Sequence, residues 1–312
     1  MCVFTIVFYC AYVVQDLKPE HYHGFSFKVK GKFLLTFAFY FLIKQRLGNV
    51  FMKTVIVPVD FSETSLNAAR YAINLLTGHY GVNMILHHMY DKASEANEIA
   101  GKLDQLKNDL RKAGIVHVEI FAEQGDDFIE ELEKLARHRQ ADLVIMGIKG
   151  RSPIGQSLIG SNTLKMLKTK ACPVLIVPPD CVYEEVKNVL LTSDFKDVLA
   201  NTPSVPIREF LKTSHPKLHI LNVDSEHYVS LTEEFQAEKM KLKNMFQDFN
   251  PEFYFLGMND IDEAISQFAG DKNIDLIIII QKDQSIFSKL FVKSQTKKLA
   301  YQSNIPVLAV HE

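Results

Sequence analysis

The sequence predicts an α/β protein built from two tandem doubly wound domains, each with a five-stranded parallel sheet of strand order 3-2-1-4-5. From Met52 onward, short apolar runs rich in β-branched residues alternate with amphipathic stretches, which is typical of buried parallel strands and their crossover helices. This pattern occurs twice, because residues 142–147 align with 275–280 and residues 172–174 align with 305–307 without a gap between them. The chain is therefore expected to contain an internal duplication.

The first domain is expected to span residues 52–179, with five strands and four helices. Ser62 and Asp126 indicate helix starts, since their side-chain oxygens can cap free backbone N–H groups. Pro178 and Pro179 end the last strand and suit a linker, because proline lacks the N–H that a strand ladder needs. In order, the sequence predicts strand 54–59, helix 62–77, strand 82–88, helix 94–113, strand 116–121, helix 126–139, strand 142–147, helix 155–169 and strand 173–177.

The second domain is expected to span residues 186–312 and to repeat the same order. Its front also matches the first domain, since Ser193, Asp194 and Phe195 correspond to Val59, Asp60 and Phe61. Its first strand begins at Asn188, and the sequence predicts the following elements at 217–223, 229–249, 253–256, 261–270, 275–280, 287–301 and 306–310.

Residues 1–51 do not share the pattern of the rest of the chain. Their two apolar runs, 3–14 and 33–43, would each reach only about 18 Å as a helix, well short of the membrane core of about 30 Å. No Lys or Arg precedes the first run, so a signal peptide is not expected. Our interpretation is that Met52 is the true start and that residues 1–51 are an over-extended reading frame. A membrane-surface anchor is the alternative, and mass spectrometry of the native N-terminus distinguishes the two.

The composition argues against a nucleic-acid-binding protein and against a secreted, disulfide-rich protein. The chain of 312 residues is 47% hydrophobic and 23% charged with a formal net charge of -2, which gives no electrostatic reason to expect a nucleic-acid partner. The four cysteines show neither paired CxxC spacing nor the density of a secreted disulfide scaffold. A cytoplasmic location is therefore expected.

A glycine-rich stretch after the fourth strand is the main candidate for chemistry. Gly147, Gly150 and Gly160 lie where the chain leaves a buried strand and enters a helix, so backbone N–H groups can turn toward a phosphate. Asp60 ends the first strand, and the first and fourth strands flank the point where strand order reverses, which is where open α/β sheets bind ligands. Two alternatives stay open: the glycines only shape a long turn, and Asp60 is only a turn or helix-cap residue before Ser62.

At these residues the chain resembles the universal stress protein family, whose ATP-binding members carry the motif Gly-x2-Gly-x9-Gly followed by Ser or Thr. Gly147, Gly150, Gly160 and Ser161 match it residue for residue. The segments 56–62, 86–87 and 172–174 extend the resemblance over the first domain, and it continues more weakly over the second. It implies adenine nucleotide alpha hydrolase-like folds, ATP with Mg²⁺ and a role in the stress response. It also implies that Pro58, Asp60 and the backbone around His88 surround the nucleoside, while Met146, Gly147, Gly150, Gly160, Ser161 and Asn162 line the ribose and phosphates.

The second domain has lost this glycine pattern. Ile280, Asp283 and Lys293 stand where the first domain has its three glycines, and only Ser294 is retained. Side chains there would obstruct a close approach of the backbone, and Asp283 would place a negative charge near a phosphate. We therefore expect no nucleotide in the second domain, which would serve to pack against the first. The last strand of each domain, 173–177 and 306–310, offers an edge for this pairing, and a further homo-oligomer is open.

Other residues carry weaker signals. His87 and His88 should point to opposite faces of their strand, and no carboxylate or cysteine lies at ligand spacing, so no metal site is expected. Lys149 and Arg151 could contact phosphates or be only solvated. Without a Walker lysine, a placed general base or paired carboxylates near the loop, a nucleotide-binding regulator with an unknown protein partner is favoured over an efficient enzyme. A slow ATPase that phosphorylates Ser152 or Ser157, and a purely structural protein, are the alternatives.

Overall fold

The computed structural model describes residues 52–79, 81–114, 117–148, 161–224, 232–281 and 304–311. The chain divides into two units, Met1–Asn49 and Val50–Glu312, and all described residues belong to the second. The expectations for residues 1–51, for the helix at 287–301 and for the first part of the helix at 155–169 therefore lie outside the described residues.

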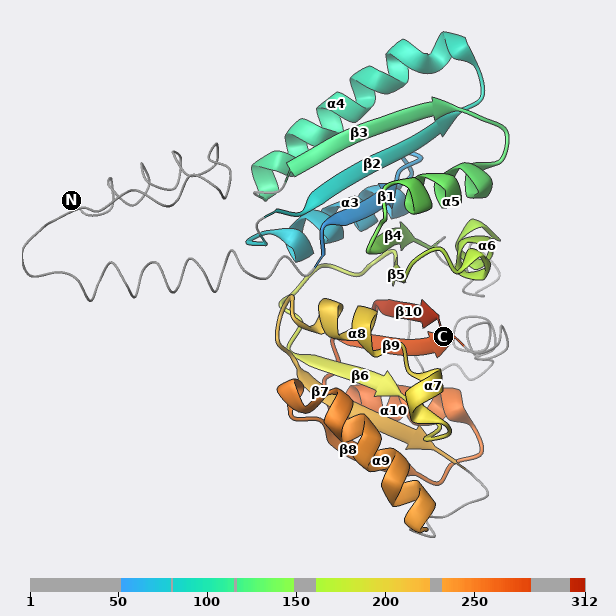
Figure 1. Ribbon diagram of the computed structural model, residues 1–312. Helices are drawn as coiled ribbons and strands as arrows, with labels where there is room; N and C mark the ends of the chain where they lie inside the picture. Colours follow the sequence, from blue (N-terminus) through green and yellow to red (C-terminus); the bar gives the residue numbers. More distant parts are fainter. Residues whose placement is uncertain are drawn as a thin grey trace, which may run out of the picture. The chain divides into compact units, whose positions relative to one another are not determined.

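The first half of the described unit follows the order expected from the sequence (Figure 1). Ser62 caps the first helix, and Asp127 rather than Asp126 caps the third by accepting from Ile129 N and Glu130 N. Its elements are β1 (Thr54–Pro58), α3 (Glu63–Leu76), β2 (Asn83–Tyr90), the 3₁₀ turn η2 (Ala93–Glu95), α4 (Ala96–Ala113), β3 (His117–Gln124), α5 (Phe128–His138), β4 (Leu143–Gly147), α6 (Ser161–Thr169) and β5 (Val174–Val177).

The second half repeats the order of the strands, and its helices differ most near its start. Between its first two strands the chain forms two short helices, because Pro203 cannot continue the first and instead caps the second. The helix expected at 229–249 begins at Glu233 and ends at Met245, before a 3₁₀ turn. The elements are β6 (Asn188–Thr192), α7 (Val198–Asn201), α8 (Ser204–Leu211), β7 (Lys217–Val223), α9 (Glu233–Met245), η3 (Gln247–Phe249), β8 (Glu252–Leu256), α10 (Ile261–Asp271), β9 (Leu276–Gln281) and β10 (Val307–His311).

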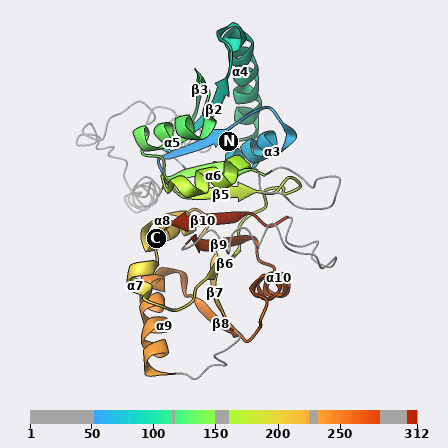
Figure 2. The same cartoon turned by 90° about the vertical axis from the view of Figure 1, so that its right-hand side faces the viewer.

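The ten strands of the described residues lie in one sheet, of order β3-β2-β1-β4-β5-β10-β9-β6-β7-β8. Each half has the expected order 3-2-1-4-5, and all pairs within a half are parallel. The halves join through an antiparallel pair of β5 with β10, in which Leu175 faces Leu308, and Figures 1 and 2 show these strands side by side. The two expected sheets are thus one continuous sheet, joined at the edges that the sequence pointed to.

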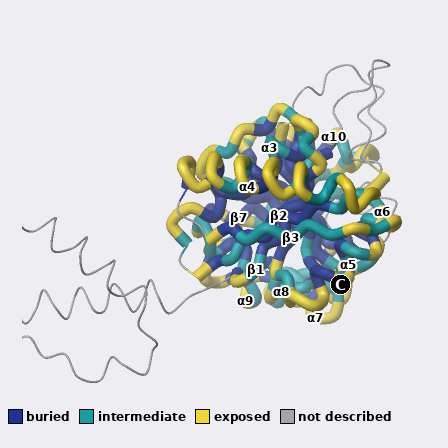
Figure 3. Tube along the Cα trace, turned by 90° about the horizontal axis from the view of Figure 1, so that it is seen from above, coloured by how far each residue is buried: buried dark blue, intermediate teal, exposed yellow. Residues whose placement is uncertain are grey.

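Helices cover both faces of this sheet, which explains why its strands are almost continuously apolar. Successive residues of β1, such as Val55 and Ile56, are both fully buried because they enter two different cores. One core gathers residues of α3, α4, α8 and α9, and the other gathers residues of α5, α6 and α10. Figure 3 shows the buried strands between helices whose outer faces are exposed.

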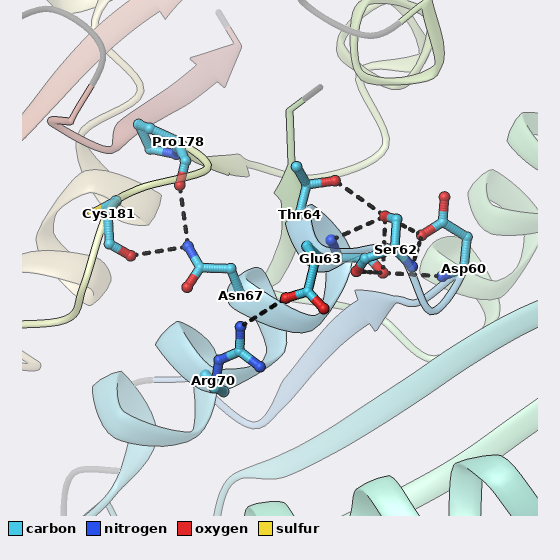
Figure 4. A network of polar contacts seen from close by, with 9 residues as sticks. Asp60, Ser62, Glu63, Thr64, Asn67, Arg70, Pro178 and Cys181 are labelled. Atoms are coloured by element: carbon cyan, nitrogen blue, oxygen red, sulfur yellow. Dashed lines mark hydrogen bonds and ion pairs between the residues drawn. The ribbon is translucent and has the colours of Figure 1, made fainter. Parts of the chain in front are cut away.

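The linker between the halves is held against α3. The side-chain amide of Asn67 donates to the carbonyl oxygens of Pro178, at 3.1 Å, and Cys181, at 2.9 Å (Figure 4). Tyr71 also packs edge-on against Tyr183 of the linker, with ring centroids 5.2 Å apart. Within the described ranges, no helix has both the length and the apolar character needed to cross a membrane.

Candidate functional site

A cavity of about 330 Å³ lies at the carboxyl ends of β1, β2 and β4. Strand order reverses here, since β1 lies between β2 and β4, and the helices that follow these strands leave toward opposite faces of the sheet. The first turns of α3, α5 and α6 therefore also border the cavity. Its lining consists of Pro58, Val59, Asp60, Ser62, Thr64, Ser65, His88, Met89, Phe128, Met146, Gly147, Ser161, Asn162 and Thr163.

The structure brings together every described residue that the sequence pointed to. Those that line this one cavity are Pro58, Asp60, His88, Met146, Gly147, Ser161 and Asn162. Gly150 and Gly160, together with Lys149, Arg151, Ser152 and Ser157, lie outside the described residues.

Asp60 is the one carboxylate among the described lining residues, and it belongs to a tight polar turn (Figure 4). Its Oδ1 accepts from the backbone N of Ser62 at 3.0 Å and from the Ser62 hydroxyl at 2.5 Å. Partial burial opposes ionisation of this carboxyl group, but hydrogen bonds from Ser62 and Ser65 outweigh that effect and lower its pKa. Asp60 is thus a turn residue, and Ser62 is the helix cap. The carboxylate of Asp60 still borders the cavity as an ionised acceptor.

The turn that carries Asp60 is strained at the next residue. Phe61 has a φ of 62°, in the left-handed region that bulky side chains rarely adopt. Its ring packs on that of His88, with centroids 5.0 Å apart. Nδ1 of His88 lies 2.6 Å from the carbonyl oxygen of Val59, so contacts from β2 hold the turn on both sides of Asp60.

Two helix starts line the cavity with hydroxyl and backbone N–H groups, next to the ionised carboxylate of Asp60. Ser62, Thr64 and Ser65 lie at the start of α3, while Ser161 and Asn162 begin α6. Backbone N–H groups at a helix N-terminus lack partners within the helix and carry partial positive charge. This wall of hydroxyl and N–H groups suits phosphate oxygens.

Gly147 serves packing as well as the cavity wall. A Cβ atom at this position would lie 2.3 Å from the carbonyl oxygen of Thr64, far inside contact distance. Glycine is therefore required for β4 to touch the first turn of α3. From the sequence, this glycine was expected to allow close approach of a ligand, and the contact with the helix was not expected.

Several lining residues were missed by the sequence argument. Ser62, Thr64 and Ser65 are three hydroxyl residues within five positions of Asp60, and this cluster was a signal that could have found them. Phe128, Met89 and Thr163 carried no such signal, because their place depends on how β2, α5 and α6 meet.

The side chains of His87 and His88 lie on opposite faces of β2, as the alternation of side chains along a strand predicted. The side chain of His87 is fully buried, its Nε2 lies 2.7 Å from Oε1 of Glu123, and its ring stacks near Phe121 and Phe128. Burial lowers the pKa of His87, and Glu123 offsets only part of this effect. Among the described residues, no three His, Cys, Asp or Glu side chains are grouped as a metal site would require.

The second half has a smaller cavity at the equivalent place, of about 110 Å³. The turn is retained, because Asp194 lines this cavity and Phe195 has a φ of 57°. The interior differs, since isoleucine side chains from β9 and α10 occupy its wall, namely Ile261, Ile265, Ile279 and Ile280. Asp283, Lys293 and Ser294 lie outside the described residues.

Comparison with known proteins gives one consistent result. The model of the universal stress protein family matches residues 52–178 and 210–311, which together exceed half of the chain. A universal stress protein of Methanocaldococcus jannaschii is 27% identical over 167 residues, covering 48% of this chain and 96% of its own.

Two solved structures add to this comparison. A universal stress protein of Archaeoglobus fulgidus has the same fold over 85% of this chain and 98% of its own, with a TM-score of 0.59 and 18% identity. A universal stress protein in complex with cAMP is 27% identical over 40% of this chain and 96% of its own, with a TM-score of 0.35. On the strength of the family match over both halves, the chain belongs to the universal stress protein family.

Proposed function

We propose that the cavity of the first half binds ATP together with Mg²⁺, and that the protein is a nucleotide-binding regulator of the stress response. The observation that carries this proposal is the convergence of Asp60, His88, Gly147 and Ser161 on one cavity of about 330 Å³, within the usual size of ligand sites. Those residues come from four separate segments of the sequence. If the glycines only shaped a turn, these four residues would have no reason to line the same cavity.

The cavity is lined by two chemically different kinds of group, and Asp60 adjoins the start of α3. The carboxylate of Asp60 and the apolar side chains of Met146 and Phe128 suit a nucleoside, with its hydroxyl groups and flat base. The starts of α3 and α6 suit the phosphates. The residues present therefore fit a nucleotide, and Mg²⁺ would enter with the phosphates, because Asp60 is the one carboxylate among the described lining residues.

We further propose that residues 52–179 form the nucleotide domain and that residues 186–312 form a partner domain without nucleotide. The second cavity, of about 110 Å³, is about a third of the size of the first, and four isoleucines form part of its wall. Its role is then structural, since β10 covers the edge of β5 that would otherwise be open.

Calorimetric titration of the full chain with ATP and Mg²⁺ tests both proposals. We expect about one nucleotide per chain, and we expect Gly150→Asp, which copies Asp283 of the second half, to abolish binding. Asp275→Asn is a control outside the cavity and should bind as the wild type does. No binding by the wild type would leave a structural protein as the better interpretation, two equal sites would contradict the division of labour, and sustained turnover would favour the ATPase alternative.

A further inference from the structure

The two halves make the same side-chain bond with different residues. Nδ1 of His88 lies 2.6 Å from the carbonyl oxygen of Val59, and the amide of Asn222 donates to the carbonyl oxygen of Ser193 at 3.0 Å. The positions are equivalent, because each follows the residue whose carbonyl accepts the last backbone bond of the first strand. An imidazole and a carboxamide can each present an N–H group, and a carbonyl oxygen can only accept a hydrogen bond. The shared requirement is thus a donor to this carbonyl group.

The carbonyl group needs that donor because the strand ladder has ended. Val59 N still bonds to His87 O at 2.8 Å, but the next peptide turns away, and Asp60 N donates to the Ser65 hydroxyl at 3.3 Å. Val59 is itself buried, so water does not readily replace a lost partner. The left-handed residue then follows in both halves, at Phe61 with a φ of 62° and Phe195 with a φ of 57°.

The second half shows that this bond does not depend on a nucleotide. Asn222 forms it where the cavity is smaller, is lined in part by isoleucines, and lacks the glycine pattern. The bond therefore shapes the turn. In the first half, that turn fixes the backbone on both sides of Asp60, whose carboxylate borders the larger cavity.

We propose that His88 is a positioning residue of the nucleotide site: its Nδ1–H bond to the Val59 carbonyl holds the strained turn, and the turn aims the Asp60 carboxylate at the ligand. This inference rests on the proposed nucleotide function. It assigns to the His88 side chain a role different from ligand contact, and it makes Asn the natural substitute, because the second half already uses Asn there.

Four proteins test this proposal by titration of the full chain with ATP and Mg²⁺: the wild type, His88→Asn, His88→Leu and Asn222→Ala. We expect His88→Asn to keep the affinity within about threefold, and His88→Leu, which has no donor, to weaken it by about tenfold, the equivalent of one lost hydrogen bond. Asn222→Ala removes the same bond from the half without nucleotide and should leave the affinity unchanged, even though it lowers the melting temperature.

Each other outcome overturns the proposal for a distinct reason. Equal losses in His88→Asn and His88→Leu would mean that the imidazole itself contacts the nucleotide. An equal loss in Asn222→Ala would mean that general stability matters, and no loss in His88→Leu would mean that the bond is irrelevant. Should the wild type not bind, the proposed function fails and this inference falls with it.

Nitrogen NMR keeps the test decisive if His88→Leu does not fold. In the wild type, a positioning role predicts that Nδ1 of His88 carries its proton before nucleotide is added and that its signal does not move on binding. A proton on Nε2 alone, or a large shift on binding, would contradict the proposal.

Discussion

Gly147 on β4 backs onto the carbonyl oxygen of Thr64 in the first turn of α3, so closely that a Cβ atom would lie 2.3 Å from it. This contact fixes how near the fourth strand comes to the helix that carries the hydroxyl groups of the cavity. It gives one residue two roles, since Gly147 lines the cavity and also sets its width.

Gly147→Ala should therefore destabilise the protein. The new methyl group meets backbone rather than a flexible side chain, so strand and helix must separate, and we expect the free energy of unfolding to fall by about 1–3 kcal/mol. Denaturant titration measures this change. Gly101→Ala, in the exposed middle of α4 with nothing within 4 Å, is the matched control and should instead stabilise by about 0.5–1 kcal/mol. Equal effects of the two substitutions would refute the contact.

In each half, one aspartate accepts two backbone hydrogen bonds from residues at the start of the first strand. Oδ2 of Asp142 accepts from the backbone N of Lys53 at 2.6 Å and of Thr54 at 2.9 Å, while Oδ2 of Asp275 accepts from Lys187 and Asn188, both at 2.8 Å. Asp142→Ala and Asp275→Ala should each cost about 1–3 kcal/mol of unfolding free energy, because each leaves two N–H groups without this acceptor. In the double variant the losses should add, as they do for distant sites. A loss of stability in one single variant but not in the other would show that the two aspartates are not equivalent.

Asn67 should hold the linker to α3. Asn67→Ala removes both bonds to the linker carbonyl groups, and we expect a loss of about 1–2 kcal/mol and faster cleavage by chymotrypsin after Tyr183. Glu63→Gln, on the same helix, breaks an exposed ion pair with Arg70 at 3.8 Å (Figure 4) and removes a charge from the first turn, so it should change stability by less than about 1 kcal/mol and leave cleavage unchanged. Unchanged cleavage in Asn67→Ala would show that the linker is held by Tyr71 and Tyr183 instead.

His87 should make stability depend on pH. Because burial lowers the pKa of His87 in the folded protein, the unfolded chain, with a histidine pKa of about 6.5, takes up a proton first as the pH falls. The stability that neutral His87 contributes is thus complete above about pH 6.5 and is lost as the pH falls through the lower folded-state pKa.

His87→Gln cannot titrate but can still bond to Glu123, so the loss of unfolding free energy between pH 7.5 and pH 5.5 should be smaller in this variant than in the wild type. Burial also lowers the pKa of His79 and His219, so the variant should reduce the pH dependence rather than abolish it. Identical pH dependence in the two proteins would contradict the assignment to His87.

Much of the fold and part of the candidate site followed from local sequence. The alternation of apolar runs with amphipathic stretches determined the strands, and side chains such as Ser62 determined where helices begin. The duplication indicated that both halves share one strand order, and the expected doubly wound fold gave that order as 3-2-1-4-5. Asp60 and Gly147 could be placed together because the carboxyl ends of neighbouring parallel strands meet at one edge of the sheet.

The tertiary structure alone decided the rest, because it depends on contacts between residues far apart in the chain. The pairing of β5 with β10 into one sheet is a choice of edge and register, which repeat length does not determine. The bond from His88 to Val59 and its counterpart from Asn222 to Ser193 join adjacent strands through side chains of different types, so no pattern along the sequence reveals their equivalence. Packing likewise decided that one cavity measures about 330 Å³ and the other about 110 Å³. Sequence determined which elements form, and the contacts between them determined how large a cavity each half has.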